Sequence, residues 1–142
     1  MKDMTMEEAR RFLLDTPRTG KMAVTREDSR PHVSPIWFDF DGDTLVFTTW
    51  HTSVKGRSIV QNPNICMCVD DEQPPYAYVI IEGTAEMSDP PEEERVYWAT
   101  RIAKRYMGEE QGVVFGKRNG IPGEHVVRVK VAKIVAHKGI TD

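Results

Sequence analysis

The chain has 142 residues, 39% of them hydrophobic and 8% aromatic, which is typical of one globular domain. Its 19 lysines and arginines are outnumbered by 22 acidic residues, so the net charge of -3 provides no general attraction for nucleic acid or an anionic membrane. No apolar run approaches the ~20 residues of a membrane span, and the N-terminal segment lacks the apolar core of a signal peptide. We expect one cytoplasmic domain over residues 1–142, with no nucleic-acid and no membrane partner.

The first part of the chain reads as one helix followed by three strands. Residues 3–17 have the pattern of an amphipathic helix that Thr5 can cap and that Pro17 ends. The pattern then changes to β-rich runs over 20–28, 30–42 and 43–51, and Asp41-Gly42 is a strong hairpin signal between the last two. Three successive antiparallel strands are therefore predicted.

The middle of the chain reads as a short helix and two strands. In the helix, residues 53–63, we expect Val54, Ile59 and Val60 to pack inward and Asn62-Pro63 to end it. The runs over 64–72 and 77–89 are nearly continuous in apolar residues, which indicates strands buried on both faces. Cys66 and Cys68 are one residue apart, which does not match a redox CxxC motif and indicates two buried free thiols.

The last third reads as a long helix, a loop and a strand. Residues 88–108 form the longest predicted helix, with Ser88 or Asp89 as its cap. Residues 109–123 contain four glycines and are predicted to be a loop, of which 112–123 could cover a substrate. Residues 124–139 alternate as a final strand. Six antiparallel strands with short flanking helices in so few residues predict a mainly β fold, a small closed or split barrel.

A cluster of cationic and hydroxyl side chains surrounds the start of the short middle helix. If Ser53 begins this helix, its first backbone amides point outward, where the helix dipole also favours an anion. Lys55 supplies a point charge and Arg57 a two-pronged donor, and Thr49 and Ser58 add hydroxyl groups. The pattern predicts a site for a phosphate or carboxylate, and the alternative is a capped surface helix with solvated charges.

The spacing of this segment resembles the phosphate-binding segment of the pyridoxamine 5'-phosphate oxidase-like superfamily of flavin and deazaflavin proteins. The run "TWHTSVKGRSIVQNP" carries the resemblance, and "GKMAVTREDSRPHVSPIWFDFDGDTLVFTT" and "YAYVIIEGTAEM" are similar to strands of that superfamily in the same order. The last run is most similar to the branch that binds coenzyme F420. The resemblance implies a six-stranded antiparallel split β-barrel, FMN-binding split-barrel type, that forms a homodimer with cofactor sites at the interface.

The resemblance also implies roles for individual residues. The cofactor phosphate would contact Lys55 and Arg57 together with the hydroxyl groups of Thr49, Ser53 and Ser58. The segment Ser34-Pro35-Ile36-Trp37 would lie along the cofactor ring. Tyr76 and Tyr78 would reach in from the other subunit and are possible proton donors. The plain alternatives are that Trp37 belongs to the core and that Tyr76, which follows Pro74-Pro75, closes a turn.

The implied function is an oxidoreductase that binds F420 and transfers a hydride from the reduced deazaflavin to a small unsaturated organic substrate. The alternatives are an FMN-dependent oxidase or reductase and a non-catalytic flavin or haem binder, because F420 and FMN share the ribityl phosphate. Candidate contacts for the longer F420 tail are Lys21, Arg26, Arg30, Lys117 and Arg118. The four histidines have no ligand-like spacing with each other or with the cysteines, so no metal site is expected.

Overall fold

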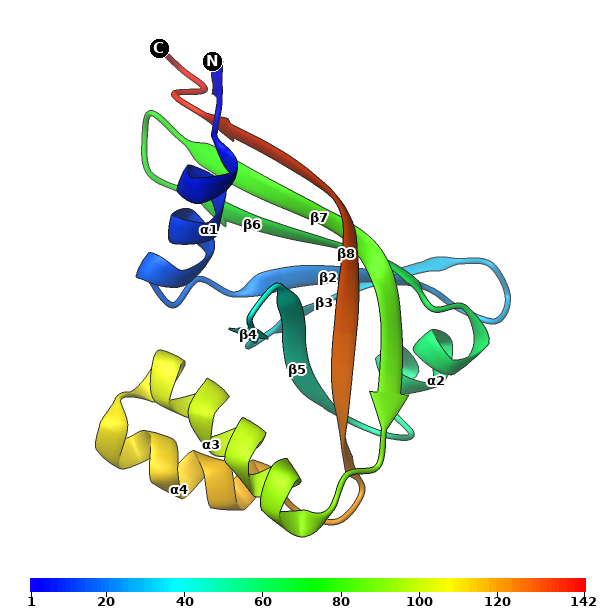
Figure 1. The fold of residues 1–142 in the computed structure, drawn as a ribbon. Coiled ribbons are helices and arrows are strands. Elements are labelled where there is room, and N and C mark those ends of the chain that lie inside the picture. Colours follow the sequence, from blue (N-terminus) through cyan, green and yellow to red (C-terminus); the bar gives the residue numbers. More distant parts are fainter.

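The computed structural model describes residues 1–142 as one antiparallel sheet with four helices (Figure 1). The elements in chain order are β1 Lys2–Asp3, α1 Met6–Asp15, β2 Gly20–Thr25, β3 Pro31–Ile36, β4 Asp39–Asp41, β5 Thr44–Trp50, α2 Val54–Gln61, β6 Asn64–Asp71, β7 Ala77–Ser88, α3 Glu92–Met107, α4 Glu109–Asn119 and β8 Glu124–Lys138. None of the helices has both the length and the apolar character needed to cross a membrane.

The sheet has the strand order β3-β2-β6-β7-β8-β5-β4, and the short β1 pairs with the end of β8. The long strands β7 and β8 curve through both halves of the molecule, so that the sheet wraps into a partly closed barrel (Figure 1). Their pairing is interrupted by a register shift between Glu82 and Gly83. A Cβ atom on Gly83 would lie 2.5 Å from the carbonyl oxygen of Lys130, so the close approach of these strands requires glycine here.

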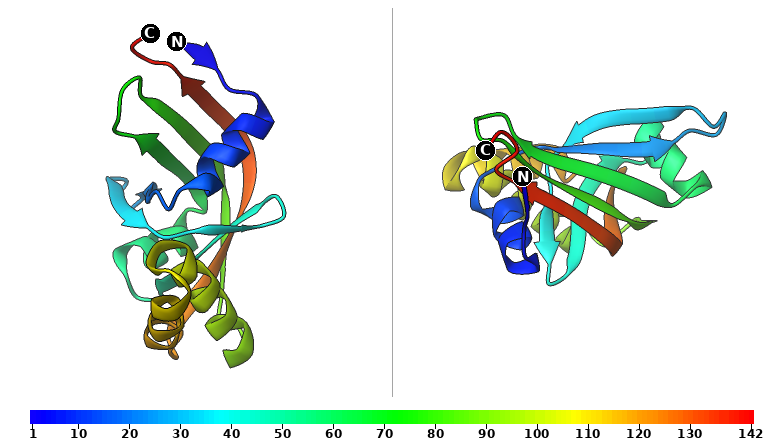
Figure 2. Two further views of the ribbon diagram at one scale, coloured as in Figure 1. Left: turned by 90° about the vertical axis from the view of Figure 1, so that its left-hand side faces the viewer. Right: turned by 90° about the horizontal axis from the view of Figure 1, so that it is seen from above.

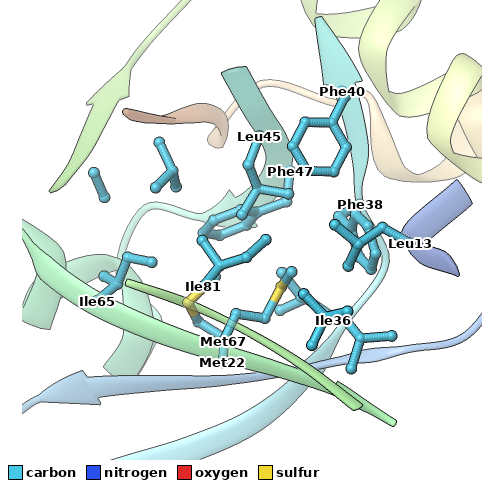
Figure 3. Close-up of a cluster of buried hydrophobic side chains, with 14 of the residues drawn as sticks. Leu13, Met22, Ile36, Phe38, Phe40, Leu45, Phe47, Ile65, Met67 and Ile81 are labelled. Atoms are coloured by element: carbon cyan, nitrogen blue, oxygen red, sulfur yellow. The ribbon is translucent and has the colours of Figure 1, made fainter. Parts of the chain in front are cut away.

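The barrel interior holds a core of 20 buried side chains, and Figure 3 shows its central members. Leu45 and Phe47 of β5 point into this core because alternate residues of a strand face opposite sides. Val46 faces the other way and packs with Trp98 and Ile102 of α3 and with Val126 of β8. The helix α3 therefore lies against the outer surface of β5 and β8, beside the barrel (Figures 1 and 2).

Two predicted helix caps are confirmed. Thr5 and Glu8 form a capping box at the start of α1. Ser53 caps α2, because its hydroxyl oxygen accepts a hydrogen bond of 3.0 Å from the Gly56 amide. The predicted packing of α2 is wrong in part, since Ile59 is buried but Val60 is 65% exposed and Val54 is also exposed. Gly56 and Ser58 occupy the other buried positions, so only a narrow stripe of this short helix contacts the sheet.

The prediction of a loop over 109–123 is wrong, since most of it forms the helix α4, which packs against α3. A Cβ atom on Gly112 would lie 2.6 Å from Lys104 Cα, and one on Gly116 would lie 2.6 Å from Thr100 Cα. These glycines therefore permit close helix packing rather than movement, and the idea of a mobile lid loses its basis.

Three other expectations differ from the structure. The strand count is eight rather than six, because β1 and β4 are short additional strands and Trp37 and Phe38 interrupt the predicted 30–42 strand. The helix α3 begins after Pro91 without a side-chain cap, so neither Ser88 nor Asp89 caps it. Strands β6 and β7 alternate between buried and partly exposed residues, which leaves Cys66 and Cys68 half-buried on one face.

Candidate functional site

A cleft of about 330 Å³ lies where the barrel meets the helices α2, α3 and α4. Its walls come from the end of β3, from β5, from the first turn of α2 and from the start of β8. The lining residues are Pro35, Ile36, Trp37, Thr48, Lys55, Ala99, Ile102, Asn119 and Glu124. The cleft thus combines an aromatic ring, apolar walls, one cationic side chain and one carboxyl group.

Trp37 is held in place by aromatic neighbours from the two C-terminal helices. Its ring stacks on Tyr106 of α3, with centroids 5.2 Å apart and planes within 4°, and it meets the edge of Phe115 of α4. The Tyr106 hydroxyl group donates to the carbonyl oxygen of Arg18 at 2.9 Å and accepts from the Phe38 amide at 3.3 Å. Burial raises the pKa of Tyr106, so this hydroxyl stays protonated and keeps donating. The position of Trp37 is therefore fixed by packing.

Lys55 projects from the first turn of α2 into this cleft. Its Nζ atom lies 3.5 Å from Ser34 Oγ and 5.8 Å from the centre of the Phe47 ring. None of the ion pairs in the chain includes Lys55. Burial lowers the pKa of Lys55, although the negative charge of Glu124 opposes this change. A half-buried cation without a carboxylate partner is suited to binding an anion.

The first turn of α2 is shaped by the residues that precede it. Thr49 is buried and its Oγ1 atom lies 3.1 Å from Ser53 Oγ, which in turn caps the Gly56 amide. A Cβ atom on Gly56 would lie 2.8 Å from the carbonyl oxygen of Trp50, so this tight turn requires glycine. The capping leaves the amides of Val54 and Lys55 without partners inside the helix.

Arg57 and Ser58 face away from this cleft. They line a second cleft of about 550 Å³ on the other side of α2, with Arg26 and His51 among its other residues. Positions two apart on a helix point in different directions, which separates Arg57 from Lys55. Ser58 is buried and its Oγ atom donates to the carbonyl oxygen of Val54 at 2.6 Å, so that hydrogen is already used. The structure thus brings Lys55 together with Ser34, Pro35, Ile36 and Trp37, but not with Arg57 and Ser58.

Tyr76 and Tyr78 lie at the opposite end of β6 and β7 from α2. Tyr76 is 41% exposed at the turn before β7, and Tyr78 contacts the ring of His137. Strand β6, eight residues long, starts three residues after α2 and ends at this turn. At about 3.3 Å per residue, the two ends of this strand are about 25 Å apart. Within one chain, neither tyrosine lines the cleft that contains Lys55.

Glu124 is the charged residue of the cleft that sequence reasoning missed, together with the uncharged lining residues Thr48, Ala99, Ile102 and Asn119. It opens β8, and its register partner on β5 is Trp50, just before α2. Burial raises its pKa to about 7, even though the charge of Lys55 acts in the other direction. Nothing in the alternating pattern of residues 124–139 marks this carboxyl group. It comes to line the same cleft as Lys55 only when β8 aligns with β5.

The chain matches the family model of pyridoxamine 5'-phosphate oxidase over residues 5–138. It belongs to the pyridoxamine 5'-phosphate oxidase family. This confirms the resemblance drawn from the sequence and, with the sheet described above, the split-barrel fold class. Proteins of this fold bind flavins or deazaflavins, and the family includes oxidoreductases.

Solved structures of the same fold cover nearly the whole chain. An F420 reductase shares 25% identity with a TM-score of 0.68, over 87% of this chain and 94% of its own. A conserved hypothetical protein from Mycobacterium tuberculosis has a TM-score of 0.81 at 20% identity, over 100% and 92% of the two chains. An FAD-binding protein from Mesorhizobium loti has a TM-score of 0.71 at 16% identity, over 95% of each. No match was found among curated proteins.

Proposed function

We propose that this member of the family binds coenzyme F420 and transfers a hydride from the reduced cofactor to a small unsaturated organic substrate. The observation that carries the proposal is Lys55, a half-buried cation with no carboxylate partner, at a helix N-terminus beside the Pro35–Trp37 segment. The 25% identity to an F420 reductase supports F420 over FMN. FMN is the alternative cofactor, because a ribityl phosphate would contact Lys55 in the same way.

The residues of the cleft have distinct parts in this proposal. Lys55 and the free amides at the start of α2 bind the phosphate, as an ammonium group and a helix dipole favour an anion. Ser53 and Thr49 shape that turn, and Ser34 orients the Lys55 ammonium group. Pro35, Ile36 and the packed ring of Trp37 form a rigid wall against which the cofactor ring is oriented. The bound reduced cofactor supplies the hydride, while the apolar wall formed by Ala99 and Ile102 excludes water.

Arg57 and Ser58 are weaker candidates than Lys55 for contact with the cofactor phosphate. Arg57 is exposed on α2 and can reach an anion at the start of the helix only from the side of the second cleft. Ser58 has no free donor hydrogen in this structure, so its predicted phosphate contact would require its hydroxyl group to leave the Val54 carbonyl oxygen. Lys55 is therefore the stronger candidate for the principal phosphate contact.

The cofactor is tested by titrating the purified protein, without cofactor, with F420 and separately with FMN while following fluorescence. We expect F420 to bind at least about tenfold more tightly, a difference of about 1.4 kcal/mol. Oxidation of the reduced F420 by an α,β-unsaturated ketone would then establish hydride transfer. Tighter binding of FMN would favour the flavin-dependent alternative, and binding without oxidation by any acceptor would favour a non-catalytic binder.

We also propose that two copies of the chain complete the site. Tyr76 and Tyr78 lie at the end of β6 and β7 that is remote from α2 and do not line the Lys55 cleft, so we expect them to contact the cofactor of a second chain rather than that of their own. Exposed Tyr76 and the half-buried face of β6 and β7 that carries Cys66 and Cys68 offer a surface for such pairing. Sedimentation equilibrium is expected to give twice the chain mass of 16.2 kDa at micromolar concentration. A monomer would remove both tyrosines from the site.

A further inference from the structure

We propose that Glu124 takes up a proton when an anionic ligand binds beside Lys55, so that its carboxyl group faces the ligand as a hydrogen-bond donor. The ligand class is a phosphate-bearing cofactor, for which the inference rests on the proposed function. Glu124 would then be the residue that adjusts the charge of the cleft to the charge of the ligand. This assigns a role to a carboxyl group that lies beside an anion-binding cation.

Glu124 and Lys55 lie in one cleft, and neither is bound to another charged side chain. Glu124 and Lys55 line the same cleft of about 330 Å³ from opposite elements, β8 and α2. Neither side chain belongs to an ion pair of the chain. None of the side-chain hydrogen bonds of the structure includes the Glu124 carboxyl group. Both groups are therefore free to contact a ligand between them.

The surroundings of Glu124 contain no second cation that could keep it ionised. The other elements lining the cleft contribute the uncharged side chains of Thr48, Ala99, Ile102 and Asn119. The nearby guanidinium group of Arg95 donates to the Gly120 carbonyl oxygen. The adjacent His125 lies 3.7 Å from Asp89, and His51 bonds to the Gly123 carbonyl oxygen. Lys55 is the one charged side chain that faces Glu124 inside the cleft.

Binding of an anion changes the balance that acts on Glu124. In the free protein, the charge of Lys55 partly offsets the burial that raises the pKa of Glu124 to about 7. An anion beside Lys55 neutralises that charge, adds repulsion and removes water, and all three effects raise the pKa of a carboxyl group further. The proton is therefore taken from solvent as the ligand binds. The affinity for the anionic ligand is therefore highest below pH 7, where Glu124 is already protonated, and it falls as the pH rises through 7.

The test compares FMN and F420 binding by the wild-type protein and by Glu124→Gln, a neutral mimic of the protonated side chain. For each ligand, we expect the affinity of the wild type divided by that of Glu124→Gln to fall by about tenfold between pH 6 and pH 8. The reason is that a carboxyl group with a pKa of about 7 is mostly protonated at pH 6 and mostly ionised at pH 8 in the free wild type. Titration of the ligand phosphate itself cancels in this ratio. Glu86→Gln, an exposed carboxylate on β7, and His125→Gln, a neighbouring titratable group, are the controls and are expected to keep the wild-type pH dependence.

A second measurement uses the wild type alone and so does not depend on how the variant folds. Calorimetry in buffers of different ionisation enthalpy is expected to show uptake of close to one proton per site at pH 8 and little at pH 6. Binding without proton uptake at pH 8, or with the same pH dependence in Glu124→Gln, would overturn the inference and leave the proposed function intact. If neither FMN nor F420 binds at any pH, the proposed function fails and the inference fails with it.

Discussion

Replacing Lys55 with alanine is expected to weaken the binding of F420 or FMN by about 10- to 100-fold. The reason is that a charge-assisted hydrogen bond to a phosphate contributes about 1.5–3 kcal/mol, and Lys55 is the one cation that lines the cleft with Pro35 and Trp37. The measurement is a fluorescence titration at fixed ionic strength. Lys130→Ala removes an exposed lysine of β8 that has no ion pair, and it is the matched control that should leave affinity unchanged.

A second substitution at the same turn separates anion binding from helix stability. Ser53→Asp keeps a side chain that caps α2 well, because aspartate is as good an N-cap as serine, but it places a negative charge where the phosphate would lie. We expect wild-type thermal stability with affinity reduced at least as much as in Lys55→Ala. Unchanged cofactor binding in both variants would return the start of α2 to its simpler interpretation as a capped surface helix.

Replacing Phe47 with alanine is expected to lower the free energy of unfolding by about 3–5 kcal/mol, the usual cost of deleting a buried phenylalanine ring. Phe47 is fully buried in the core of the barrel, as Figure 3 shows, and its ring also lies below the Lys55 ammonium group. Urea denaturation followed by circular dichroism would measure the loss. Such a loss is a large part of the stability of a small domain, so the variant should unfold at much lower urea concentration.

The matched control for this prediction is Val60→Ala on α2. The periodicity of residues 53–63 predicts that Val60 packs inward, whereas the structure leaves it 65% exposed. An exposed valine contributes little, and we expect a change within about 0.5 kcal/mol. A loss of several kcal/mol in Val60→Ala would show that α2 is packed with its other side against the barrel. In that case Lys55 would not face the cleft that Trp37 and Glu124 line.

Several features of this protein follow from residues that are close together in the chain. Thr5 and Glu8 form a capping box, and Ser53 begins α2, because these contacts depend on side chains reaching backbone amides within one turn. The Asp41-Gly42 turn likewise results from local geometry, since Gly42 has a φ of 60°. The mainly β fold class and the capped start of α2 could therefore be predicted from the sequence.

Other features depend on which elements pack against each other. The glycines of residues 109–123 are typical of a loop, yet Gly112 and Gly116 allow α4 to approach α3 closely, which is apparent only when both helices are present. Val60 is exposed because the narrow contact of α2 with the sheet leaves no partner for it.

The sequence by itself determined that Lys55 follows a helix cap in a segment suited to an anion. Only the tertiary structure decided that Glu124 faces Lys55, while Arg57 faces a different cleft. The physical reason is that the pairing of Trp50 with Glu124 sets the start of β8 beside the start of α2, through backbone hydrogen bonds between strands far apart in the chain. No local pattern encodes that register, and the charge balance of the cleft depends on it.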